Sequence, residues 1–150
     1  MSEHRATLQW QRKTPDFTYE SYDRTHQISF PGGASFQASS AVEYRGDARL
    51  PNPEQLLAAS ASSCHMLSFL AIAAKYRFVV DAYEDESGAL LEKNAAGKMA
   101  VTRITLRPKV RFGGDKLPSP EQVQEFHHKA HEMCFIANSL ASEVVVEPRG

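Results

Sequence analysis

A run without charged residues, at positions 55–74, dominates the hydrophobic pattern and consists mainly of Ala, Ser and Leu. Asn52 can cap the start of a helix, Pro53 suits the first helical position, and Glu54 places an acid in the first turn. Because apolar and small residues occur on every side, the pattern predicts a helix over residues 52–76 that is buried all round. Such a helix needs more cover than one small sheet supplies, and dimerisation would provide the remainder.

Segments in which apolar and polar residues alternate precede this helix, and this period of two is typical of strands. The predicted strands before the helix are residues 5–11, 17–22, 25–30 and 36–44. Asp23 and Arg24 form the expected hairpin turn between the second and third of them, and the sequence Pro31-Gly32-Gly33 then breaks the pattern. The first 50 residues are therefore predicted to be an antiparallel meander.

The pattern after the helix contains fewer and longer elements. It predicts, in order, strands at 78–89 and 99–112 joined around 92–97, a helix from Ser119 to about Cys134, a turn or short helix at 135–140, and a strand at 142–147. Gln122 can complete a capping box with Ser119. Pro108 lacks an amide donor, which places it at an edge or a bulge.

The order ββββ-α-ββ-α-β predicts an α+β fold in which sheets cover a central helix. The length of 150 residues fits one domain, with the meander at 1–50, the central helix at 52–76 and a ββαβ part at 77–148.

Charge and composition narrow the classes of partner. The net charge of -1, with both signs mixed along the chain, gives no basic stripe, so a nucleic-acid partner is not expected. The first residues lack the apolar run of a secretory signal, which favours a cytoplasmic location. The run at 55–74 is long enough to cross a bilayer. However, it contains His65 and several serines and has strand-like sequence on both sides, so no membrane partner is expected.

Cys64, in the middle of the central helix, and Cys134 are the two cysteines. Each is either a small buried apolar residue or a member of a redox pair. Cys64 lies far from the helix N terminus, so a reactive thiolate there needs a cation from elsewhere. The candidate cations are Arg45, Arg49, Arg24 and Arg12. Glu54 is the carboxylate that could hold such a guanidinium in place.

Helix geometry limits how Glu54 can serve Cys64. Ten residues of helix separate the two by about 15 Å along the axis and leave them on different faces. They cannot meet within one straight helix. Either the helix bends, or Glu54 and its arginine act on the thiol of a second subunit.

Two other chemistries have weaker signals. His127 and His131 are spaced i, i+4, and His128, Cys134 and His65 could join them in a zinc site, but the chain has no CxxC or HExxH motif. Hydrolase chemistry has less support, because no serine near His65 lies in a G-x-S-x-G turn. These serines are Ser62, Ser63 and Ser68.

The segment Asn52-Pro-Glu-Gln-Leu-Leu-Ala-Ala-Ser-Ala-Ser-Ser-Cys64, with Ala130-His-Glu-Met-Cys134-Phe-Ile-Ala-Asn-Ser-Leu140 downstream, resembles the family of osmotically inducible protein C (OsmC) and organic hydroperoxide resistance protein (Ohr). The resemblance implies antiparallel sheets around a long central buried helix in an intertwined homodimer. It also implies a thiol peroxidase that reduces organic hydroperoxides, with no cofactor and an external dithiol as reductant.

The same resemblance assigns roles to four residues. Cys64 matches the peroxidatic cysteine, Cys134 the resolving cysteine, and Glu54 the carboxylate that orients an arginine. We assign this arginine to Arg45 from its position before the helix, with Arg12, Arg24 and Arg49 as alternatives.

Two departures from the family pattern indicate a divergent OsmC-like branch. Phe135 stands where the family usually has proline, and His65 follows Cys64 where an apolar residue is common. Met66, Leu67 and Phe69 are expected to supply part of an apolar wall that favours alkyl peroxides. The alternative from another functional class is an OsmC-like stress protein that binds a metal or small ligand through His and Cys without peroxidase turnover.

Overall fold

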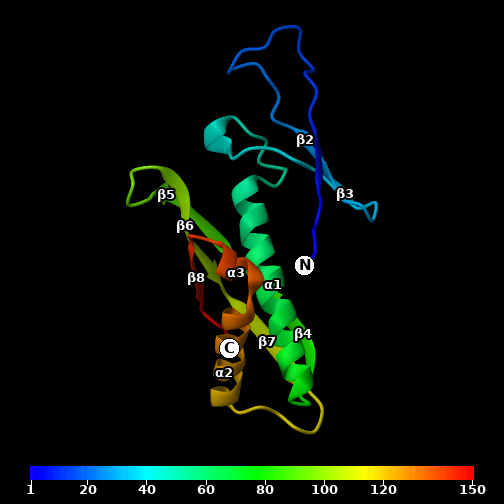
Figure 1. Cartoon of the computed structure of the whole chain (residues 1–150), viewed down its shortest axis with the longest axis vertical. Coiled ribbons are helices and arrows are strands. Elements are labelled where there is room, and N and C mark those ends of the chain that lie inside the picture. Colours follow the sequence, from blue (N-terminus) through cyan, green and yellow to red (C-terminus); the bar gives the residue numbers. More distant parts are fainter. The chain divides into compact units, whose positions relative to one another are not determined.

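Three short antiparallel strands form the sheet of the N-terminal unit, residues 1–56, in a computed structural model that describes residues 1–150 (Figure 1). The strands are β1 (Thr7–Gln9), β2 (His26–Ser29) and β3 (Ser35–Ala38), with β2 in the middle. The β2–β3 hairpin turns at the expected break, where Gly33 has a φ of 94° that favours glycine. The predicted meander is therefore present with three strands.

Of the four strands predicted in this unit, the one at 17–22 is wrong and the one at 36–44 is shortened. Residues 17–22 form a turn in which the hydroxyls of Thr18 and Ser21 bond to each other and to nearby backbone groups. Side chains of this kind compete with strand pairing. The strand predicted at 36–44 ends at Ala38, and η1 (Val42–Tyr44) follows, because the Ser39 amide donates to the Pro51 carbonyl.

Helix α1 (Pro53–Lys75) confirms the predicted central helix to within one residue at each end. Asn52 and Gln55 cap it reciprocally, since each side chain bonds to the other residue's amide at 2.9 Å. The prediction that this helix is buried on every side is wrong for the single chain. The buried residues of α1 are Ala58, Ala61, His65, Phe69, Ile72 and Ala73. The exposed residues of its opposite side include Ala59, Ser60, Ser63, Leu67, Ala71 and Ala74.

Helix α1 is also long and apolar enough to cross a membrane, by length and composition only. Core helices of proteins without a membrane span meet the same criterion, so this property is weak evidence for a membrane-spanning helix.

Two small sheets and two helices cover one side of α1 in the C-terminal unit, residues 57–150. Strand β4 (Val79–Asp85) pairs with β7 (Pro108–Gly113), and β6 (Met99–Leu106) lies between β5 (Gly88–Lys93) and β8 (Glu143–Val146). Each predicted long strand is thus divided between two sheets. Pro108 stands at one division, as its missing donor predicts, and the Asp85 carboxylate receives the Arg107 amide there. The β6–β8 pair is parallel, and the other pairs are antiparallel.

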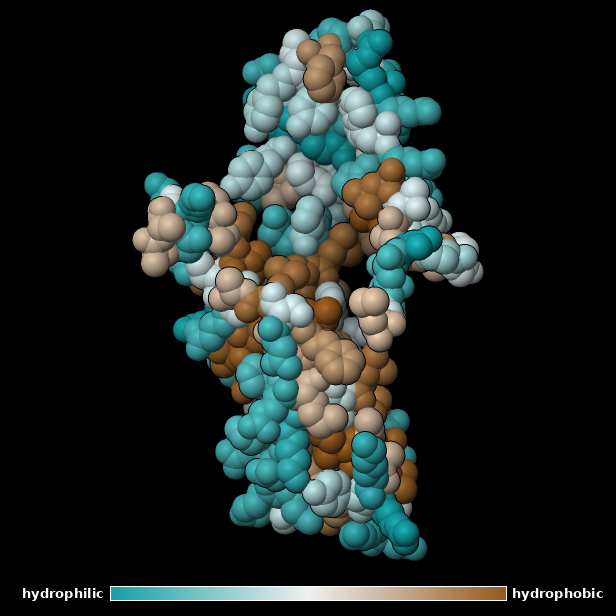
Figure 2. All heavy atoms as spheres, viewed as in Figure 1, coloured by the Kyte–Doolittle hydropathy of each residue, from teal (hydrophilic) through white to brown (hydrophobic).

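Helix α2 (Pro120–Met133) begins with the predicted capping box between Ser119 and Gln122, and α3 (Phe135–Ser139) follows after Cys134. The side chain of Phe69 packs with Phe126 of α2 in one core cluster, and Ala61 packs with Ile104 of β6 in another. Figure 2 shows hydrophilic residues over the outer side of α2 and hydrophobic residues beside it. The basic residues of β6 and β7 are exposed.

Candidate active site

The two thiols lie together in the C-terminal unit, although seventy residues separate them in the sequence. Cys64 is partly exposed on α1, and Cys134 is buried at the junction of α2 and α3. Both are free thiols. The two thiols are close enough for Cys64 to influence the pKa of Cys134. The fold therefore brings together the pair that the resemblance assigns to redox chemistry.

The environment of Cys134 favours its protonated form. Burial raises the pKa of this thiol, and the neighbouring Cys64 thiol raises it further. The Ala137 amide, which donates to Sγ at 3.4 Å, acts in the opposite direction. Cys134 is thus the protected thiol of the pair, and Cys64 is the one that a reagent from solvent reaches.

Glu54 lies in the first turn of α1 and forms no ion pair in the chain. Helix α1 is continuous from Pro53 to Lys75, so about 15 Å of axis separate Glu54 from Cys64. The structure gives no sign of the bend that would bring them together within one helix.

Of the four candidate arginines, Arg24 is the buried one, with 8% exposure. Its guanidinium lies 3.5 Å from the ring centroid of Tyr22 and donates to the carbonyls of Tyr22 and Tyr19. Its Nε atom is buried without a partner, and no carboxylate lies within ion-pair distance.

The other three arginines are exposed. Arg45, our choice from the sequence, has a left-handed backbone with a φ of 65° and lies 5.5 Å from the Tyr19 ring centroid. Arg49 pairs with Asp47 at 2.7 Å, and Arg12 donates to backbone carbonyls. Sequence position alone did not distinguish Arg24, since its burial depends on the turn at residues 17–22.

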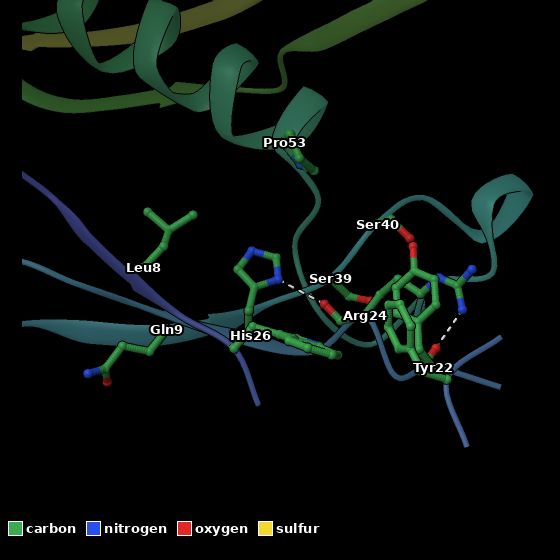
Figure 3. A pocket seen from close by; sticks show the side chains of 10 residues that line it. Leu8, Gln9, Tyr22, Arg24, His26, Ser39, Ser40 and Pro53 are labelled. Carbon is green, nitrogen blue, oxygen red and sulfur yellow. Dashed lines mark hydrogen bonds between the residues drawn. The ribbon is translucent and has the colours of Figure 1, made fainter. Parts of the chain in front are cut away.

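A pocket of about 540 Å³ lies beside Arg24 within the N-terminal unit (Figure 3). Its walls are mainly apolar, and His26 and Ser39 add polar groups. His26 Nδ1 lies 2.8 Å from the Arg24 carbonyl, a contact that Figure 3 draws as a dashed line. The apolar walls include Leu8, Trp10, Phe17, Tyr22 and Pro53.

A buried pair of histidines occupies the core of the C-terminal unit. His65 Nε2 and His127 Nδ1 lie 3.0 Å apart, so one nitrogen donates to the other. Burial lowers the pKa of each imidazole to about 4, and the positive charge of His127 and of His131 lowers that of His65 further. Asp85 acts in the opposite direction on both. The pair is therefore neutral at pH 7.

The rival chemistries find little support in this geometry. His65 and His127 lie close together, as the zinc interpretation required, but they bond to each other, and no group of three or more His, Cys, Asp or Glu is arranged to hold a metal ion. His128 is exposed and lies 3.2 Å from Glu132. The Ser62 hydroxyl donates to the Asp85 carboxylate at 2.5 Å and not to a histidine. This contact does not support hydrolase chemistry at Ser62.

The expected apolar wall on α1 is partly wrong. Phe69 is fully buried and packs against Tyr83, Phe112, Phe126 and His127, so it belongs to the core. Leu67 is 61% exposed and remains available to a ligand or a second subunit.

An α+β fold that places a partly exposed thiol on its central helix beside a buried second thiol defines the class of this protein. The family model described as OsmC-like protein matches residues 46–149. The chain belongs to the OsmC family.

Solved structures support this assignment. An OsmC-like protein of unknown function from Vibrio cholerae is 44% identical, with a TM-score of 0.96 over 99% of this chain and 100% of that one. The organic hydroperoxide resistance protein OhrB of Bacillus subtilis is 21% identical, with a TM-score of 0.69 over 99% and 98% of the two chains. An organic hydroperoxide resistance protein OsmC of Legionella pneumophila is 17% identical, with a TM-score of 0.69 over 99% and 96%. No curated relative matches the chain.

Proposed function

We propose that this protein is a thiol peroxidase that reduces organic hydroperoxides through Cys64 and Cys134. The observation that carries the proposal is the contact between a partly exposed thiol and a buried thiol, which the fold creates from distant parts of the chain. Membership of the OsmC family and the likeness to proteins described as organic hydroperoxide resistance proteins support a peroxide-related stress function.

The first step is attack of the Cys64 thiolate on the terminal peroxide oxygen. The O–O bond breaks, the alkoxide leaves as an alcohol after it takes up a proton, and Cys64 becomes a sulfenic acid. The Cys134 thiol then attacks the oxidised sulfur, the S–O bond breaks, and water leaves as the disulfide forms. An external dithiol restores both thiols by two exchange steps and becomes a disulfide itself.

Activation of Cys64 requires a cation, and we propose that an arginine of the N-terminal unit supplies it with Glu54 as its partner. Arg45 remains the assignment from the sequence. The burial of Arg24, without a carboxylate of its own, favours Arg24 as the alternative. Because Glu54 lies too far along α1 to serve its own Cys64, a second copy of the chain would provide these groups in a homodimer.

Counting thiols tests this proposal directly. Reduced protein receives one equivalent of cumene hydroperoxide and is then denatured, and its free thiols are titrated. We expect two thiols to disappear per chain in the wild type. In Cys134→Ser, we expect a sulfenic acid at Cys64 that dimedone traps and mass spectrometry locates.

The matched control is Cys64→Ser, which keeps the buried Cys134 and should keep its one thiol under the same treatment. If the wild type retains both thiols, the peroxidase is excluded and the interpretation as a binding or stress protein without turnover takes its place.

A further inference from the structure

A cavity of about 570 Å³ lies between β7 and α2 in the C-terminal unit. Pro108, Val110 and Phe112 alternate along β7, so all three lie on the strand face that lines it. Val123 and His127 stand one turn apart on α2 and form the facing wall. The other lining residues are Pro118, Pro120, Gln124, Pro148, Arg149 and Gly150. Neither thiol lines this cavity.

The walls of the cavity are apolar and held in place. Four of the lining residues are prolines, whose rings restrict the backbone. Val110, Phe112 and Val123 pack against a core cluster but stay only partly buried, so they keep apolar surface toward the cavity. The Arg149 amide donates to the Pro108 carbonyl at 2.8 Å, which ties the segment after β8 to the start of β7. A preformed apolar cavity of this volume is typical of small-molecule sites.

His127 is the buried polar side chain of the cavity, with 5% exposure. Its Nδ1 atom faces His65 Nε2, whereas its own Nε2 atom forms no hydrogen bond and is not fully enclosed by protein. The Nδ1 atom of His65 is buried without a partner. If His127 donated to His65, that Nδ1 atom would carry a proton with no acceptor, which is the costlier arrangement. His65 therefore donates to His127, and the Nε2–H group of His127 is a free donor at the cavity.

Arg149 adds a positive charge at the same cavity. Its Nε atom donates to the Arg107 carbonyl at 2.7 Å, which holds the guanidinium beside the start of β7. Glu86 lies 3.5 Å from Nη1, but its side chain is 81% exposed, so solvent weakens this pairing. No Asp or Glu side chain lines the cavity. Its polar groups therefore favour a ligand with an anionic acceptor.

We propose that this cavity binds a monocarboxylate with a bulky apolar body, with the carboxylate toward His127 and Arg149 and the apolar body against the proline and valine side chains. One imidazole donor and one guanidinium suit the two oxygens of a carboxylate. A phosphate group carries more charge and more acceptor oxygens than these two side chains satisfy. The site goes beyond the proposed peroxidase and uses neither thiol, so each proposal can fail without the other.

Calorimetric titration with 1-naphthaleneacetate tests the site, and 1-naphthaleneacetamide is the matched neutral ligand of the same shape. We expect saturable binding of the acid to the reduced protein with a Kd below about 1 mM. The amide should bind at least about fivefold more weakly, because it lacks the charge that Arg149 attracts. NMR of the imidazole nitrogens should show a shift of the His127 Nε2 resonance when the acid binds.

Arg149→Gln removes the positive charge and should weaken binding of the acid by about threefold to tenfold, with little effect on the amide. Arg111→Gln is the matched control, because Arg111 lies on the opposite face of β7 and pairs with Asp81. It should leave the affinity for the acid unchanged. Equal affinity for the acid and the amide in the wild type would overturn the assignment of a carboxylate ligand.

Gln124→Trp places a large side chain at the exposed edge of the cavity and should abolish binding. Glu125→Trp places the same side chain at an exposed position of α2 that does not line the cavity, and it should bind as the wild type does. Circular dichroism checks that the variants fold. The site is overturned if no saturable binding occurs, if binding survives Gln124→Trp, or if the His127 resonance does not move. Cys64→Ser should bind the acid as well as the wild type, whatever its peroxidase activity.

Discussion

The histidine that follows Cys64 has a structural role that its position in the sequence does not reveal. His65 is 1% exposed and shares a hydrogen bond with His127, but its Nδ1 atom has no partner. The Nδ1 atom of His131 is also buried and has no partner. A solvent-shielded imidazole pair of this kind resists protonation, because burial penalises the charged form. Acid should therefore destabilise the folded state through this histidine pair.

We predict that the free energy of unfolding decreases as the pH falls from about 6.5 toward 4. The pKa values of His65 and His127 are lowered to about 4 in the folded chain, from 6.5 in the unfolded chain. Above pH 6.5 both states are neutral at these positions. Below it the unfolded chain binds protons that the folded chain does not, so by pH 4 each of the two imidazoles lowers the free energy of unfolding by on the order of 3 kcal/mol. Urea unfolding at a series of pH values measures this.

His128→Gln is the control for this prediction, because His128 is an exposed histidine of the same helix that lies outside the buried pair. NMR titration of the imidazoles assigns the effect. A His65 or His127 resonance that titrates near pH 6.5 in the folded protein contradicts the prediction.

Both long helices start where their sequences predicted, because helix starts depend on groups a few residues apart. Asn52 and Gln55 at α1, and Ser119 and Gln122 at α2, satisfy amides that the first turn leaves free. The strands were predicted less accurately. The sequence pattern predicts one strand at 99–112. The structure divides it at Arg107, because β6 pairs with β5 and β7 pairs with β4 in a different sheet.

We predict that Ser119→Ala lowers the free energy of unfolding by about 1 kcal/mol, because the Gln122 amide loses its acceptor. Gln122→Glu, which keeps an acceptor for the Ser119 amide, should change stability by less than about 0.5 kcal/mol. Thermal or urea unfolding of the three proteins compares them. A Ser119→Ala protein as stable as the wild type would show that this cap does not support α2.

At the scale of the whole molecule, the uncovered side of α1 is the feature that one chain does not explain. Leu67 is 61% exposed there among small residues, and Phe135, next to Cys134, is 79% exposed. Exposed apolar residues of this kind favour an interface with another protein chain. A second copy of the chain covers this side in the homodimer that we propose, and it would also bring Glu54 to a thiol.

We predict that the protein is a dimer at micromolar concentration and that Leu67→Glu makes it a monomer, since a charge on α1 cannot be buried cheaply. Leu117→Glu is the matched control: Leu117 is 65% exposed in the loop before α2 and should tolerate the same change without loss of the dimer. Light scattering after size-exclusion chromatography distinguishes the two. A monomeric wild type rejects the interface and the idea that Glu54 acts on another chain.

The sequence by itself determined the central helix, the cap of each long helix, the α+β class and the identity of both thiols, because these depend on local spacing and residue chemistry. It did not determine how the strands at 78–89 and 99–112 divide between sheets, or that residues 17–22 form a turn. Only the tertiary structure placed Cys64 beside Cys134, joined His65 to His127 and buried Arg24 at an aromatic pocket. Each of these depends on contacts that no local pattern encodes, since they arise when separate elements or a long connection pack together.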